Sequence, residues 1–211
     1  MNGRIDHIVI GAENLISGTS ILEKKLNTKI LPGGEHKIMG THNKLLKLQK
    51  EIYFEVIANN PNAESPTHPR WFSLDELETK EKIKNSARSL CWILAVDNIY
   101  DAVENCGYNP GEILELSRSD LKWKVTVPTD GKLIENGVLP FLIEWPKNIH
   151  PSNNLANSSI SLNKISLIHQ EPENIKHIVN NLIKSDLISI SKGLPKVEFY
   201  LKNQNNEIVI D

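Results

Sequence analysis

The sequence lacks the features of a membrane or secreted protein. In its 211 residues no apolar run approaches the roughly 20 residues that a membrane-spanning helix needs. The first residues, MNGRIDHIVIG, contain no basic segment followed by an apolar stretch and a cleavage site. We therefore expect a cytoplasmic protein that has no membrane partner.

Cysteine is scarce, and neither sign of charge is in excess. Cys91 and Cys106 stand in apolar segments of a chain without a secretory signal, which favours two buried thiols over a disulfide. Lys and Arg total 24 against 26 Asp and Glu, and neither sign forms a long block. This balance gives no electrostatic support for a nucleic-acid partner.

What the sequence does contain is one order of elements that recurs three times. Each copy has a strand with alternating apolar residues, then a helix with an apolar face, then further strands. In the first copy Asn14, a residue type that commonly caps helices, precedes the helical spacing. The expected elements are strand 4–10, helix 15–27 and strands 45–48 and 52–57; strand 90–96, helix 99–106 and strands 113–116, 123–127 and 138–145; and strand 164–169, helix 175–183 and strands 187–191, 197–201 and 207–210.

The repeat predicts an α+β fold. A strand, a crossover helix and three further strands form a sheet that the helix covers on one face only. The other face must therefore pack against a second copy or enclose something. The predicted parts are a first βαβββ module at 1–60, a linker at 61–87, a second βαβββ module at 88–151 and a third, degenerate one at 160–211.

Carboxylates interrupt two of the apolar strands. Glu55 lies within IYFEVIA and Glu144 within LPFLIEW, each on the last strand of its module. An unpaired carboxylate in such a place costs several kcal/mol, so each needs a cation, hydrogen bonds or a raised pKa.

The corresponding position of the first strands holds His7 and Cys91. If the two modules pack as pseudo-twofold mates, these residues and both glutamates surround one cavity, a candidate site for Mn, Fe, Ni or Zn. The alternative is that both glutamates pair with Lys or Arg, that His7 is a hydrogen-bonded strand histidine and that Cys91 belongs to the core.

The polar, glycine-containing segment 33–43 also carries candidate residues. His42 with Asn43 could polarise or protonate a carbonyl or enolate oxygen, and His36 lies in the same segment. The alternative is a hydrogen-bonded turn in which His42 faces solvent.

Arg70 and Trp71 form a second candidate pair. The arginine could clamp a carboxylate or phosphate beside the flat wall of the tryptophan. The alternative is a linker anchored by its aromatic residue. Arg118 and His150 are weaker candidates.

Four stretches of the first 151 residues carry a family resemblance: IDHIVIGAENL, PGGEHKIMGTHNKLLKL, HPRWFSLD, and GVLPFLIEW followed by HP. They resemble the glyoxalase-like domain family of the vicinal oxygen chelate superfamily, which includes glyoxalase I and extradiol dioxygenases. The resemblance implies that paired modules form a cupped, partly open mixed β-barrel with helices outside. By position it implies metal ligands at His7, Glu55 and Glu144, whereas Cys91 stands where His, Gln or Glu is usual.

The leading hypothesis is a small-molecule enzyme of this superfamily. A divalent metal would chelate vicinal oxygens of a carbonyl or enolate-forming substrate while Glu55, Glu144 or His42 moves a proton, in lyase, isomerase or dioxygenase chemistry. The residues expected to bind the substrate are His36, Asn43, Arg70, Trp71 and Arg118. The second hypothesis is a metal-free protein of the same fold that binds or sequesters a small molecule. Both hypotheses leave open whether the chain forms a homodimer.

Overall fold

The computed structural model describes residues 2–49, 51–118, 121–204 and 206–211. None of the helices in these ranges is long and apolar enough to cross a membrane. The elements, in chain order, are β1 (Arg4–Ala12), α1 (Leu15–Leu26), β2 (Leu31–His36), β3 (Thr41–Gln49), β4 (Ile52–Asn59), α2 (Leu77–Ile83), β5 (Ala87–Ala95), α3 (Ile99–Asn105), β6 (Glu112–Arg118), β7 (Leu121–Val127), the 3₁₀ helix η1 (Ile134–Gly137), β8 (Phe141–Glu144), the 3₁₀ helix η2 (Pro151–Asn154), β9 (Ile160–His169), α4 (Pro172–Leu182), β10 (Ile188–Lys192), β11 (Lys196–Asn203) and β12 (Asn206–Ile210).

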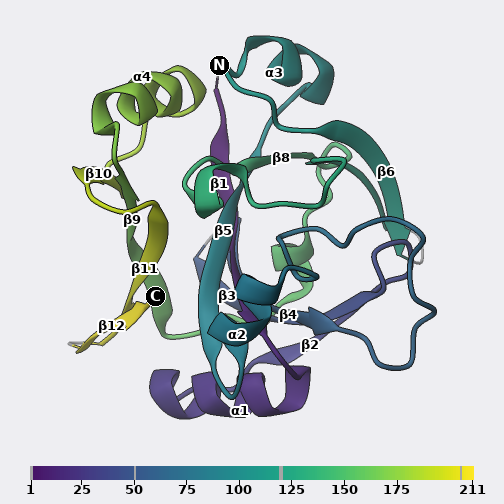
Figure 1. The fold of residues 1–211 in the computed structure, drawn as a ribbon. Helices are drawn as coiled ribbons and strands as arrows, with labels where there is room; N and C mark the ends of the chain where they lie inside the picture. The colour runs from purple at the N-terminus through teal and green to yellow at the C-terminus, as the bar shows by residue number, and fades with distance from the viewer. Residues whose placement is uncertain (1, 50, 119–120, 205) are drawn as a thin grey trace.

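One curled sheet contains the strands of the first two modules, in the order β2-β3-β4-β1-β5-β8-β7-β6 (Figure 1). In each module the first strand runs parallel to the last, β1 beside β4 and β5 beside β8. The modules join through the antiparallel pair of their first strands, β1 and β5. The predicted α+β fold, with tandem βαβββ modules in an open, cupped barrel, is confirmed.

The helices of both modules begin where the sequence predicts because asparagine side chains cap them. Asn14 Oδ1 accepts a hydrogen bond from the backbone N–H of Ile16 over 2.9 Å. Asn98 Oδ1 accepts one from the N–H of Tyr100 over 3.0 Å. These bonds satisfy donors that the first helical turn leaves without a partner. The first helix ends at Asn27, whose left-handed φ of 49° stops the helical hydrogen bonding.

Side chains of the central strands alternate between two apolar clusters. Ile8 and Ile10 of β1 point to the convex side, where they share a core with α1, α3 and α4. Val9 points to the concave side and joins Ile93 of β5. The central strands are therefore buried on both faces, and the concave cluster surrounds the pocket described below.

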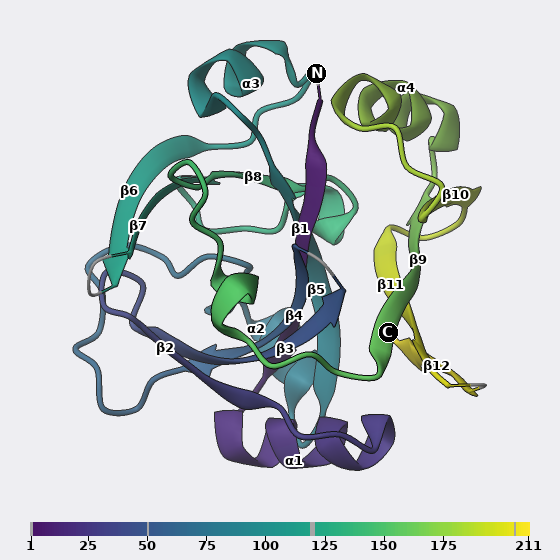
Figure 2. The same ribbon diagram turned by 180° about the vertical axis from the view of Figure 1, so that it is seen from behind.

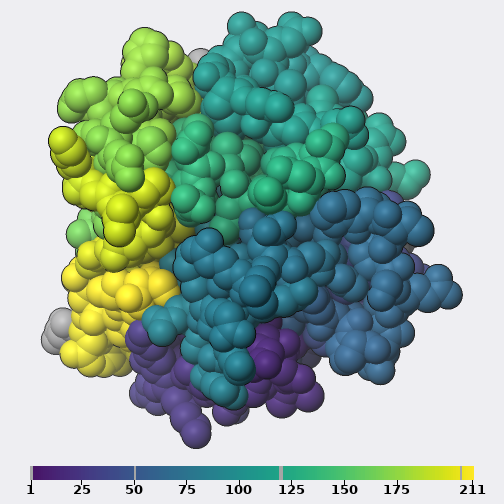
Figure 3. All heavy atoms as spheres, in the orientation of Figure 1, coloured from purple at the N-terminus to yellow at the C-terminus, as the bar shows by residue number. Residues whose placement is uncertain are grey.

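The C-terminal unit forms its own sheet, in the order β10-β9-β11-β12. Its elements follow the predicted order, but β9 lies between β10 and β11, whereas in the other modules the first strand pairs with the last. The unit lies beside the first two modules (Figures 2 and 3), and its buried apolar residues belong to the same core cluster as those of α1. In the described residues the two sheets share no strand pairing. A bond from the backbone N–H of Leu162 to Gln49 Oε1, 3.0 Å long, is one link between them.

Candidate functional site

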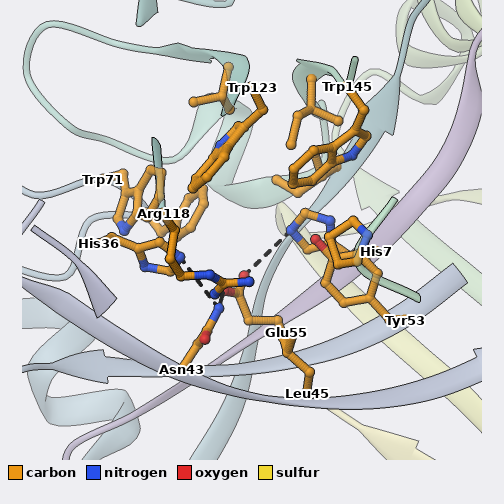
Figure 4. Close-up of a pocket in the computed structure, with 15 residues that line it drawn as sticks. His7, His36, Asn43, Leu45, Tyr53, Glu55, Trp71, Arg118, Trp123 and Trp145 are labelled. Atoms are coloured by element: carbon orange, nitrogen blue, oxygen red, sulfur yellow. Dashed lines mark hydrogen bonds and ion pairs between the residues drawn. The ribbon is translucent and has the colours of Figure 1, made fainter. Parts of the chain in front are cut away.

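A pocket lies on the concave side of the large sheet (Figure 4). Its cavity volume is about 40 Å³, within about 470 Å³ of empty space that includes open solvent. Residues of both modules line it: His7, His36, Asn43, Leu45, Tyr53, Glu55, Trp71, Phe72, Ile93, Arg118, Trp123, Val125, Ile143, Trp145 and Pro151.

Three buried ionisable residues form a chain at one side of this pocket. Asp6 Oδ1 lies 2.6 Å from His7 Nδ1, and His7 Nε2 lies 3.4 Å from Glu55 Oε2. His7 belongs to β1 and Glu55 to its parallel neighbour β4, where Val9 and Glu55 are paired. Because side chains two residues apart on a strand share a face, His7 and Glu55 both point to the concave side.

Asp6 comes from a bulge in β1. Ile5 pairs with Leu94 and His7 pairs with Ile93, so Asp6 is an extra residue between two consecutive pairs. A bulge turns a side chain away from the direction that simple alternation would give it. The bulge therefore explains why Asp6 contacts its own neighbour, His7.

Hydrogen bonds set the charges of this chain. Asp6 Oδ2 accepts from Trp145 Nε1 over 2.7 Å and lies 3.1 Å from His150 Nε2. Burial raises the pKa of Asp6, but hydrogen bonds from His150 and His7 outweigh it and lower the pKa to about 2. Burial lowers the pKa of His7, whereas hydrogen bonds to Asp6 and Glu55 raise it to about 9. Burial also raises the pKa of Glu55, yet the bond from His7 brings it below its ordinary value. At neutral pH a histidinium therefore lies between two carboxylates.

Asn43 and His36 extend the hydrogen-bonded chain. The backbone N–H of Gly34 donates to Asn43 Oδ1 over 2.8 Å, so the Asn43 amide nitrogen faces Glu55 Oε1 and His36 Nε2. With Nε2 as the acceptor, His36 Nδ1 donates to Thr41 Oγ1 over 3.0 Å. Burial lowers the pKa of His36 to about 4. His36 is therefore a neutral ring with a defined tautomer.

The neutral state of His36 predicts a loss of stability in acid. Its pKa is about 4 in the folded chain against an ordinary value of 6.5, so the unfolded chain binds the proton first. The part of the unfolding free energy that depends on the neutral His36 ring is fully present above pH 6.5. It is lost as the pH falls through 4, by up to about 3 kcal/mol. Urea unfolding of wild type and His36→Asn, from pH 7 to pH 4, should show a smaller acid loss in the variant. His177→Asn, on the exposed side of α4, is the control, and an equal acid loss in all three proteins would contradict the prediction.

Aromatic rings form most of the remaining pocket wall. Tyr53 stacks on His7 with 4.3 Å between ring centroids, and Trp123 lies 5.4 Å from Trp145. Trp71 lies across the pocket from His7 (Figure 4). These walls suit a small, flat molecule and keep water away from the charged chain.

The structure brings six of the sequence-predicted site residues together in the pocket. They are His7, His36, Asn43, Glu55, Trp71 and Arg118.

Glu144 lies outside the pocket. On β8, Phe141 and Ile143 face the concave cluster, whereas Leu142 faces the convex core, and Glu144 shares the side of Leu142. Its Oε2 accepts from the backbone N–H of Ile99 over 2.8 Å at the start of α3. Lys124 Nζ lies 3.5 Å from its Oε1. The expectation that it joins His7 and Glu55 in one cavity is not met, and its contacts are those of a helix cap and a surface ion pair.

His42 and Arg70 also lie outside the residues that line the pocket. Segment 33–43 is part of the β2–β3 hairpin, and His42 is half-buried between two buried neighbours that face the other way. Arg70 donates to Asp75 from its backbone N–H and from Nη1, each over 2.8 Å. Its guanidinium therefore closes a local turn.

Cys91, at the remaining ligand position, is fully buried in the concave cluster and does not line the pocket. Burial raises the pKa of its thiol well above the ordinary value.

Among the residues of this site that sequence reasoning missed are Asp6, Tyr53, Trp123 and Trp145. Two signals were available. Asp6 is a second charged residue beside His7 in an apolar strand, and Tyr53 shares its strand face with Glu55. The weak candidate His150 is part of the site, because it contacts Asp6.

The residues present do not fit the divalent metal that the family resemblance implies. Of the three predicted ligands, only His7 and Glu55 meet, with His7 Nε2 3.4 Å from Glu55 Oε2. Glu144, the third predicted ligand, contacts α3 instead. Within the described ranges, no group of three or more His, Cys, Asp or Glu side chains is arranged to hold a metal ion.

A family model described as a glyoxalase-like domain matches residues 5–183, which include both modules and α4. The chain belongs to the glyoxalase-like domain family. The family resemblance carried by the four sequence stretches is thereby confirmed. No protein with curated annotation matches this member of the family.

Solved structures resemble this glyoxalase-like chain at low identity. A hypothetical protein from Staphylococcus aureus is 17% identical with a TM-score of 0.56, and the match covers 99% of this chain and 84% of that one. A hypothetical protein from Bacillus halodurans is 14% identical with a TM-score of 0.46, covering 71% and 99%. A methylmalonyl-CoA epimerase from Streptomyces coelicolor is 13% identical with a TM-score of 0.45, covering 70% and 96%. At these identities the likeness concerns the fold alone.

Proposed function

We propose that this glyoxalase-like protein is a small-molecule enzyme that removes and returns a proton next to a carbonyl group. The observation that carries the proposal is the position of Glu55. Its carboxylate is 4% exposed, lines the pocket and contacts His7 on one oxygen and Asn43 on the other. A buried carboxylate beside a hydrogen-bond donor, in a cavity with aromatic walls, is the arrangement that general acid–base catalysis requires.

The geometry suggests a sequence of proton movements. His7 Nε2 is 3.4 Å from Glu55, longer than an ordinary N–H···O bond, so a substrate oxygen can take over this donor. Losing that bond makes Glu55 a stronger base, and it accepts the proton from the carbon next to the carbonyl. The electron pair moves to the carbonyl oxygen, where the His7 imidazolium stabilises the enolate. Asp6 holds the His7 ring in place. Return of the proton to the same face of the carbon regenerates the substrate and is seen as exchange, whereas return to the opposite face gives the inverted isomer.

Exchange of carbon-bound hydrogen with deuterium tests this function directly. Pyruvate, acetoacetate and dihydroxyacetone, incubated with the protein in D₂O, would be followed by proton NMR. We expect the protein to accelerate exchange, and Glu55→Gln to slow the catalysed rate by about 100-fold or more. Glu144→Gln is the matched control and should retain the wild-type rate because Glu144 lies outside the pocket. Undiminished exchange in Glu55→Gln would contradict the assigned role.

A metal-free binding protein is the second candidate, and the low pKa of Glu55 favours it. A weakly basic carboxylate in a fixed ion pair with His7 can hold a ligand without reacting with it. This function predicts that compounds bind to wild type without deuterium exchange. Metal content, measured after purification without chelators or an affinity tag, completes the test. One metal ion per chain that is lost in His7→Ala would contradict both candidates.

A further inference from the structure

We infer that the pocket binds a ligand with a carboxylate group, and that Arg118 recognises this group. The inference concerns the same pocket as the proposed function and rests on it for the presence of a small-molecule ligand. It adds the chemical class of that ligand and its orientation.

The first observation is the path of the Arg118 side chain. Arg118 ends β6 and Gly34 lies on β2, and these strands are the two outer strands of the large sheet. A Cβ atom on Gly34 would lie 2.4 Å from Arg118 Cδ and 2.7 Å from Nη1. The guanidinium therefore reaches across the opening of the cup and over a backbone that has no side chain to block it.

The second observation is that the Arg118 guanidinium has no acceptor among the described residues. Arg118 takes part in none of their ion pairs or side-chain hydrogen bonds. Arg70, for comparison, is bonded to Asp75 over 2.8 Å. Arg118 nevertheless lines the pocket. An arginine fork presents parallel donors that match the two oxygens of a carboxylate.

The third observation is the position of Arg118 within the pocket. Figure 4 shows Trp71 and His36 on one side of the pocket and His7 and Tyr53 on the other, with the Arg118 side chain running from the first side toward the centre. Trp71 Nε1 has no hydrogen-bond partner among the described residues, but it is enclosed by protein atoms and does not reach the pocket space. Arg118 is therefore the residue that presents free donors to a ligand.

The charges in the pocket give the ligand one orientation. Glu55 is negative and would repel a carboxylate, whereas Arg118 attracts one. His36, on the Arg118 side, carries no charge at neutral pH and so neither competes for the anion nor repels the guanidinium. The carboxylate therefore binds at Arg118, and the rest of the molecule extends toward His7.

Matched probes that differ in charge test this inference. Benzoate, benzamide and phenyl phosphate would be titrated into the full-length protein, with tryptophan fluorescence and the shift in Tm as readouts. We expect benzoate to bind with a millimolar or lower Kd and benzamide at least about tenfold more weakly, because a charge-assisted hydrogen bond is stronger than a neutral one. Stronger binding of phenyl phosphate than of benzoate would overturn the carboxylate assignment. The absence of benzoate binding at millimolar concentration would overturn the subsite.

Variants separate this subsite from the rest of the pocket. Arg118→Met should weaken the binding of benzoate at least about tenfold and leave the binding of benzamide unchanged. Arg118→Lys should recover part of the benzoate affinity. Arg88→Met is the control, because Arg88 pairs with Asp211 at the surface. Equal benzoate affinity in Arg118→Met and Arg88→Met would overturn the inference.

The two proposals fail in different ways. Carboxylate binding that depends on Arg118, without deuterium exchange of any compound, would support the subsite and contradict the enzyme. Exchange that depends on Glu55, with no effect of Arg118→Met on charged or neutral probes, would contradict the subsite alone.

Discussion

Asp6→Ala is expected to lower the free energy of unfolding by about 3–5 kcal/mol, the cost typical of removing one partner from a buried charged pair. The Asp6 side chain is fully buried and contacts His7 Nδ1 at 2.6 Å, Trp145 Nε1 at 2.7 Å and His150 Nε2 at 3.1 Å. Without it the His7 charge is left with Glu55 alone, and two other donors lose their acceptor. Urea unfolding at pH 6 would measure the difference.

The pH dependence of this effect identifies its electrostatic part. The pKa of Asp6 is lowered from 3.8 to about 2, so its contribution is present above pH 3.8 and is lost as the pH falls through 2. The pKa of His7 is raised from 6.5 to about 9, so its contribution is present below pH 6.5 and is lost as the pH rises through 9. The difference between wild type and Asp6→Ala should therefore be largest between about pH 4 and 6.5.

A surface aspartate provides the matched control for this prediction. Asp97 forms an exposed ion pair with Arg4 over 2.9 Å, and such pairs contribute at most about 1 kcal/mol. If Asp6→Ala were as mild as Asp97→Ala, the hydrogen bonds of Asp6 would not be holding the pocket together. Asp6→Asn, which keeps the size of the side chain, should fall between the two.

Gly137→Ala is expected to destabilise the fold by more than about 3 kcal/mol, because backbone strain and a steric clash combine. Gly137 has a φ of 85°, and a Cβ atom there would lie 1.8 Å from the carbonyl oxygen of Leu90. That oxygen belongs to the backbone of β5, so a side-chain rotation cannot relieve the contact. Thermal and urea unfolding would measure the loss.

Gly107 is the control that distinguishes backbone strain from a steric clash. Its φ of 83° is close to that of Gly137, but the nearest atom to an added Cβ is 3.9 Å away. Gly107→Ala should therefore cost only the strain of the left-handed backbone, about 1 kcal/mol. Equal losses in the two variants would show that the approach of η1 to β5 is not tight.

Much of the fold could be predicted because it depends on local patterns. Alternating apolar residues and asparagine caps are properties of short segments. Asn14 caps its helix as expected, and the second helix begins at Ile99 as expected, after Asn98. Segment 33–43 was less predictable, since its paired glycines suggest a loop. In the structure Gly33 and Gly34 belong to β2, and an added Cβ would collide with Asn43 at the first and with Arg118 at the second.

The candidate site could be predicted only where strand alternation decides it. His7 and Glu55 are in-phase positions of adjacent strands and do meet. The sequence also puts Glu144 on the same strand face as Leu142, but it does not say which face of the sheet becomes concave. Which face becomes concave depends on how the two modules pack. In this packing the face that carries Glu144 is the convex one, so Glu144 points toward α3.

By itself the sequence determined the repeated βαβββ order and two of the charged residues in the pocket, because both follow from residue types at short, regular spacing. Four of its stretches also carried the family resemblance. Only the tertiary structure decided the rest of the site. A bulge aims Asp6 at His7, and the curl of the sheet brings Arg118 over Gly34 from the opposite outer strand. Contacts of this kind join positions far apart in the chain or depart from regular alternation, so no local pattern encodes them.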